Sequence, residues 1–140
     1  MIELLKILHV IAFTAGVGGS LANLLVIKVA RSADAEAAAA LRGVIPRIGV
    51  LSVHSIVLLW ITGPLLLWLA YDGGRGLSPF FHAKMLGVIL LTLIIIASRM
   101  TIRQIKAGKP ARLAPQMPKL ALAGSLTGLI TIILAVLTFS

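Results

Sequence analysis

The stretch LLKILHVIAFTAGVGGSLANLLVI, residues 4–27, decides the fold of this chain. It is apolar nearly throughout, and it is long enough to cross a hydrocarbon core of about 30 Å as a helix, for which roughly 20 residues are needed. Within it, Gly16, Ser20 and Asn23 follow His9 at spacings that place all four residues on one face of the helix. Small side chains on such a face leave room for a neighbouring helix or for a flat ligand.

His9 is the residue of this stretch that packing alone explains least well. A histidine side chain inside hydrocarbon is costly unless something binds it. Two interpretations stay open: the imidazole is an axial ligand of haem iron, or it hydrogen-bonds to a neighbouring helix. The haem ligand is the leading hypothesis, and Gly16 on the same face is then a candidate cofactor-binding position.

The composition is that of an integral membrane protein. Of the 140 residues, 59% are hydrophobic and only 12% are charged, whereas soluble domains carry about 25% charged residues. Four apolar runs predict transmembrane helices at about 4–27, 48–69, 81–100 and 120–138. Because an open sheet cannot satisfy its backbone groups in lipid, we expect an all-α, integral membrane four-helix bundle that forms one transmembrane domain over residues 1–140.

Basic residues predict the orientation of the bundle in the membrane. Those near the first and third connections number ten: Lys28, Arg31, Arg42, Arg47, Arg99, Arg103, Lys106, Lys109, Arg112 and Lys119. The opposite side of the membrane, with the two termini and the second connection, carries Lys6, Arg75 and Lys84. Positive charge favours the cytoplasmic side, so both termini are expected on the outer, periplasmic side of a bacterial inner membrane. The basic residues are also expected to contact anionic lipids, and residues 37–40 predict a helical segment in the first connection.

Several classes of chemistry are disfavoured by what the sequence lacks. It contains no cysteine, which excludes disulfides, iron–sulfur clusters and cysteine-type zinc sites. The four carboxylates, Glu3, Asp34, Glu36 and Asp72, all lie outside the middle of the expected spans, which disfavours a proton-coupled carrier. The net charge of +9 sits at membrane edges with few aromatic residues nearby, so nucleic acid is not an expected partner.

Depth along the membrane normal sorts the candidates for a second haem ligand. At ~1.5 Å per residue, His9 and Lys84 lie at about the same depth, roughly 10 Å outward of the membrane centre, and His82 lies slightly shallower. His82 and Lys84 point about 200° apart on their helix, so only one of them is expected to face the bundle. His54 falls roughly 17 Å from His9 along the normal, so it either binds a second group or is a hydrogen-bonded core residue.

Gly124 and Gly128 form a GxxxG motif in the last apolar run. Such a motif lets two helix backbones approach closely. We expect it to support packing inside the bundle, and contact with a second copy or with a larger membrane complex is the alternative.

Two segments resemble a known family. LKILHVI at 5–11, followed by Ala15 and Gly16, and HAKMLGV at 82–88 resemble the membrane protoporphyrinogen oxidases of the HemJ type and the related CopD-like membrane proteins. The resemblance implies a b-type haem held by His9 and Lys84. The family's Asn-Glu-x-Pro pattern reads PQMP at 115–118, without the acid, so the resemblance supports haem binding better than protoporphyrinogen oxidation.

The predicted function is therefore the binding of haem b between the first and third helices, for electron transfer or for oxidation of a membrane-soluble substrate. Candidate axial ligands are His9 with Lys84 or His82. If the protein is an enzyme, the resemblance implies an oxidoreductase of the protoporphyrinogen-oxidase type. Two alternatives remain: a cofactor-free subunit of a larger membrane complex, and a transport protein for copper or a small solute that uses His9, His54 and Met85.

Overall fold

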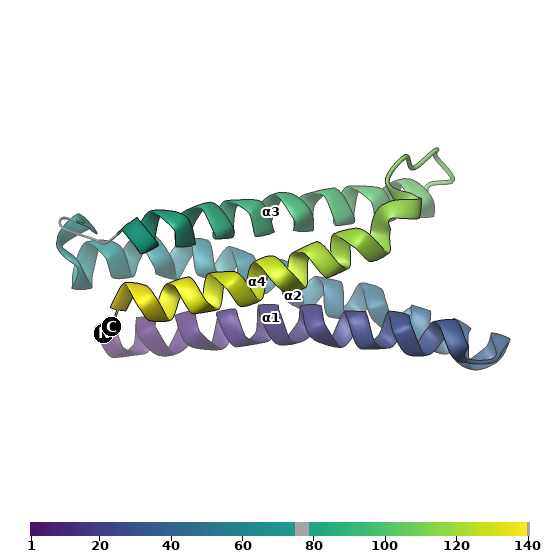
Figure 1. Ribbon diagram of the computed structural model, residues 1–140, viewed down its shortest axis with the longest axis horizontal. Helices are drawn as coiled ribbons and strands as arrows, with labels where there is room; N and C mark the ends of the chain where they lie inside the picture. Colours follow the sequence, from purple (N-terminus) through teal and green to yellow (C-terminus); the bar gives the residue numbers. More distant parts are fainter. Residues whose placement is uncertain (75–78, 140) are drawn as a thin grey trace.

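The computed structural model describes residues 1–74 and 79–139, and four long helices make up most of this part of the chain (Figure 1). They are α1 (Ile2–Ser32), α2 (Ala35–Ala70), α3 (Pro79–Lys106) and α4 (Met117–Phe139), with short 3-10 turns η1 (Asp72–Gly74) and η2 (Ala114–Gln116). The described residues contain no strand, and four helices are long and apolar enough to cross a membrane. The all-α, four-helix prediction is thus confirmed.

The helices form two hairpins. α1 and α2 contact each other along most of their length, and α3 packs on α4. The hairpins meet mainly where α4 contacts α1, whereas α2 and α3 contact each other little, and α1 and α3 lie diagonally across the bundle (Figure 1). Both chain termini lie at the end of the bundle that also carries η1 (Figure 1). At this end Lys6 forms an ion pair with Glu3 at 3.1 Å; Arg75 lies outside the described residues.

The helices extend beyond the predicted spans, most clearly at the start of α2. This helix begins at Ala35, where the Asp34 carboxylate accepts a hydrogen bond of 2.8 Å from the backbone N–H of Ala37. Such an N-cap satisfies one of the free donors of a first helical turn, and the alanines that follow favour the helix. The predicted helical segment at 37–40 is confirmed. The predicted segment at 37–40 and the predicted span at 48–69 are parts of this one helix, and Pro46 lies inside it.

Polar side chains are inside the bundle and large apolar side chains outside. The buried polar residues include Thr62, Thr101, Ser125 and Thr131, and each hydroxyl donates to the carbonyl one turn earlier in its own helix. Large apolar side chains are exposed on all four helices, with Trp68 78% exposed. In water such a surface would drive association, so this distribution is the one expected of helices that face lipid.

Glycines allow the helices to approach closely. Gly124 and Gly128 are both buried, and a Cβ on Gly128 would lie 3.2 Å from Val17 Cγ2 of α1. The GxxxG motif therefore packs α4 inside the bundle, as expected. The alternative, in which these two glycines contact a second copy or a larger complex, is not supported because α1 and α3 side chains cover them.

Gly87 of α3 provides a test of this packing. A Cβ at Gly87 would collide with the Thr131 side chain, which is buried in α4. We expect Gly87→Ala to destabilise the protein by about 1–3 kcal/mol, the usual cost of overpacking, although alanine favours a helix. Thermal unfolding in detergent measures the effect. Gly43→Ala in α2, where a Cβ meets nothing within 4 Å, is the matched control, and equal stability of the two variants would contradict this account.

Candidate functional site

His9 is half-buried and faces α2. Its Nδ1 lies 2.7 Å from Oγ1 of Thr62, a side chain that is 0% exposed. The next residue of α2 is Gly63, and a Cβ there would lie 3.6 Å from His9 Cε1. The glycine thus lets the ring lie close against the α2 backbone. Of the two interpretations left open for His9, the structure shows the hydrogen bond to a neighbouring helix, made with Thr62 of α2. The sequence did not single out Thr62, and the haem ligand stays a prediction.

The hydrogen bonds of Thr62 determine which nitrogen of His9 carries the proton. Thr62 Oγ1 donates its single proton to the carbonyl of Leu58 at 2.7 Å. Both contacts of Thr62 are satisfied together when this hydroxyl accepts from His9, so the network assigns Nδ1 of His9 as the donor in the 2.7 Å contact. In the neutral imidazole the lone pair then lies on Nε2. Metal-binding histidines are commonly oriented in this way, with one ring nitrogen donating to a protein oxygen and the other holding the metal.

Lys84 and His82 of α3 differ as the helix geometry predicts. Lys84 is half-buried. His82 is exposed, and its ring meets that of Phe81 edge to face with centroids 5.9 Å apart. The expectation that only one of the two faces the bundle is confirmed. Of the two candidate second ligands, Lys84 is thus the one whose side chain is turned towards the bundle.

His54 and Gly16 have other neighbours. His54 is exposed, so the alternative that placed it in the core is wrong, although its Nδ1 is hydrogen-bonded at 2.8 Å to the Val50 carbonyl of its own helix. His9 contacts α2 at Gly63, and His54 comes nine residues before Gly63 in this helix. The separation of His9 and His54 along the helix axis is thus ~13 Å, rather than the ~17 Å expected from the sequence. A Cβ on Gly16 would lie 3.2 Å from Ser55 Cβ, so this glycine serves close packing of α1 on α2.

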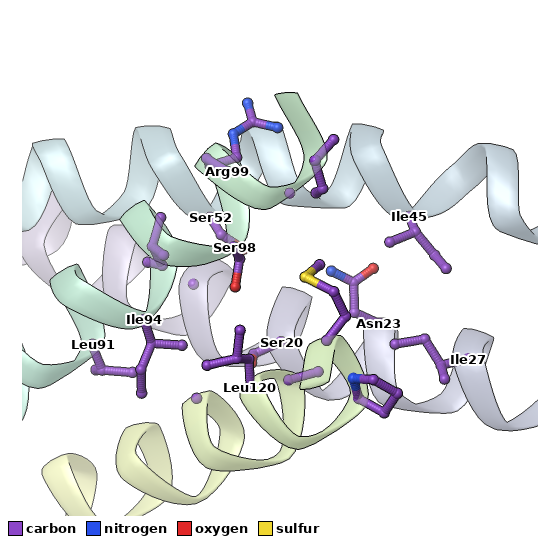
Figure 2. A pocket seen from close by; sticks show the side chains of 18 of the residues that line it. Ser20, Asn23, Ile27, Ile45, Ser52, Leu91, Ile94, Ser98, Arg99 and Leu120 are labelled. Carbon is purple, nitrogen blue, oxygen red and sulfur yellow. The ribbon is translucent and has the colours of Figure 1, made fainter. Parts of the chain in front are cut away.

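A cavity of about 720 Å³ lies between the four helices, in the half of the bundle next to the basic connections (Figure 2). Gly16, Ser20 and Asn23, the small and polar residues on the His9 face, line it. It ends at Phe13 of α1 and Leu59 of α2, about one turn from His9 and Thr62. The histidines and Lys84 are not among its lining residues. The cavity therefore does not reach His9, and a ring system bound to His9 Nε2 would lie outside it, on the other side of Phe13 and Leu59.

Comparisons with protein families, curated proteins and solved structures found no match for this chain. Among residues 1–74 and 79–139, no three histidine, cysteine, aspartate or glutamate side chains form a group that could hold a metal ion. The site can thus be described as one oriented imidazole on α1, its hydroxyl partner on α2 and a half-buried lysine on α3.

Proposed function

We propose that this chain is a multi-pass membrane protein that binds haem b through His9, with Lys84 as the second ligand. The observation that carries the proposal is the hydrogen bond from His9 Nδ1 to Thr62 Oγ1, which leaves the Nε2 lone pair for a metal. Haem suits so small a donor set because the macrocycle supplies four ligands to its iron and the protein needs to supply only one or two.

Each residue of the site has a distinct role in this proposal. His9 binds the iron, and Thr62 fixes the orientation and the tautomer of its ring, as outer-shell partners of metal ligands do. Lys84 approaches from α3, which lies diagonally opposite α1. Bound haem would supply one-electron redox chemistry, and the surrounding helices would keep water away and admit a membrane-soluble partner or substrate. The proposed activity is electron transfer or oxidation of such a substrate, as the resemblance to the HemJ type implies.

The proposed location is a bacterial inner membrane. Of the basic residues of the chain, ten lie towards the end of the bundle that holds the α1–α2 and α3–α4 connections. The positive-inside rule supports placing this end in the cytoplasm. Both termini would then face the periplasm, and His9, near the start of α1, would lie in the outer half of the membrane.

An absorption spectrum tests the proposal directly. We expect protein expressed with added haem precursor and purified in detergent to show a Soret band with about one haem per chain. A spectrum without that band, on protein that elutes as a single folded species, would reject haem binding and favour the cofactor-free subunit. Metal analysis of the same sample would detect copper, as the transport alternative requires.

The second ligand can be assigned by paired substitutions on α3. We expect Lys84→Met to shift the Soret band while much of the haem is retained, and His82→Ala to leave the spectrum unchanged. An amine must lose its proton to bind a metal, so the spectral species that depends on Lys84 should grow as the pH rises. A shift in His82→Ala and none in Lys84→Met would assign the ligand to His82 instead.

A further inference from the structure

We propose that the cavity between the four helices binds one anionic phospholipid from the membrane leaflet next to the basic connections. This proposal does not depend on haem. Along α1 the lining runs from Phe13 to Arg31, which corresponds to ~27 Å at 1.5 Å per residue. The cavity volume of about 720 Å³ is within the range of roughly 300–1,000 Å³ usual for small-molecule sites, so the cavity would hold the head group and part of one acyl chain while the rest of the lipid stays in the bilayer.

The inner walls of the cavity suit an acyl chain. They are formed mainly by aliphatic side chains, among them Leu59 of α2 and Leu91 and Ile94 of α3 (Figure 2). A mainly apolar space of this kind favours hydrocarbon over water. Because α2 and α3 contact each other least among the neighbouring helices, a chain can enter between them from the bilayer.

The other end of the cavity suits an anionic head group. Arg31, Arg42, Arg99 and Lys106 line it, and its lining includes no acidic residue. The ion pair between Lys6 and Glu3 is the one found in the described residues, and it lies at the opposite end of the bundle. Guanidinium groups bind phosphate by paired hydrogen bonds. A phosphate in this position would supply the negative charge that the lining residues themselves lack.

Arg99 marks the entrance between α2 and α3. Its Nη1 lies 3.5 Å from the position that a Cβ on Gly49 of α2 would occupy. The Arg99 side chain therefore extends from α3 to α2, where the absence of a side chain on Gly49 leaves room for it. Figure 2 shows Arg99 at the edge of the cavity, with Ser98 and Asn23 pointing into it. The head group of a lipid that enters between these two helices would therefore meet a guanidinium.

Asn23 adds an independent observation. Its Oδ1 is buried and has no hydrogen-bond partner among the described residues, and a buried acceptor in this state requires a donor. Whatever fills the cavity must supply that donor. A glycerol head group carries hydroxyls, and a phosphate also brings bound water. The occupant is thus expected to be an amphiphile with a polar, hydroxyl-bearing head, such as phosphatidylglycerol.

Native mass spectrometry of the full-length His9→Ala variant tests this proposal without interference from haem. We expect one phosphatidylglycerol to be retained per chain, with at least about tenfold preference over phosphatidylcholine of the same acyl chains. The double variant Arg42→Gln/Arg99→Gln should lose at least about tenfold of this affinity. The double variant Arg47→Gln/Arg103→Gln is the matched control, since it removes the same charge from α2 and α3 at exposed residues that do not line the cavity.

The control and two further measurements decide between occupants. Equal losses in the two double variants would show general attraction of lipid to a basic surface and would overturn the proposal. Binding of inorganic phosphate as tight as that of the lipid would overturn it in favour of a soluble anion. Ser98→Phe, which fills the cavity and keeps every arginine, should abolish retention; undiminished retention in folded protein would place the lipid elsewhere.

Discussion

Replacing His9 by alanine is expected to lower the haem content of the purified protein by roughly tenfold or more. Loss of an outer-shell partner of a metal ligand already costs about 10–100-fold in affinity, and this substitution removes the ligand itself. The ratio of Soret absorbance to protein absorbance, measured on wild-type and variant protein expressed under the same haem supply, gives the result.

The fold is expected to survive this substitution. Thr62 keeps its donor bond to the Leu58 carbonyl, so removal of the imidazole leaves no buried hydroxyl proton without an acceptor. The side chain removed is only half-buried. Elution as a single species and a thermal transition close to that of the wild-type protein, compared in the absence of haem, would separate loss of a ligand from loss of structure.

His54→Ala is the matched control for His9→Ala. His54 is also a histidine in a membrane-spanning helix, but it is exposed and bonded to the carbonyl of Val50 in its own helix. We expect this variant to keep its haem. Retention of the full Soret band in His9→Ala, or an equal loss in His54→Ala, would contradict the assignment of His9 as the ligand.

The fold could be predicted from the sequence because the membrane imposes it. Apolar runs of about 20 residues can only be helices when water is absent from their surroundings, and the runs at 4–27 and 81–100 lie entirely inside α1 and α3. The helix ends could not be predicted so well, since outside the hydrocarbon they depend on local capping and propensity. The Asp34 cap and the alanines after it extend α2 well before residue 48.

The candidate site could be predicted in part. The cost of a histidine in hydrocarbon singled out His9, and helical angles predicted that His82 and Lys84 face different ways. Thr62 was missed because threonines are common in membrane helices. Its predicted depth is close to that of His9, and a glycine follows it, and these two features could have indicated that it contacts His9. The cavity was also missed. That Arg42 and Arg99 line one space depends on how α2 and α3 sit against each other, which a single sequence does not reveal.

Thr62→Val is expected to weaken haem binding by about 10–100-fold, the usual effect of losing an outer-shell partner, even though His9 is still present. Valine keeps the shape of threonine but cannot accept the proton of His9 Nδ1. The ring then loses its fixed orientation, and the proton can move to Nε2, where it blocks binding to iron. Haem titration of the apo-protein in detergent, followed at the Soret band, measures the affinity. Thr62→Ser, which keeps the hydroxyl, should bind nearly as tightly as wild-type protein.

Thr101→Val separates this effect from a general loss of stability. Thr101 is as deeply buried as Thr62 and donates to a carbonyl one turn earlier in the same way, at 2.8 Å to Ala97, but it has no histidine partner. Each valine variant loses one hydroxyl-to-carbonyl hydrogen bond, worth about 1 kcal/mol, and Thr62→Val also loses the bond from His9 Nδ1. Both variants should therefore be less stable than the wild-type protein, with the larger loss in Thr62→Val. Only Thr62→Val should weaken haem binding. An equal loss of haem affinity in both variants would show that packing, and not the orientation of His9, controls the site.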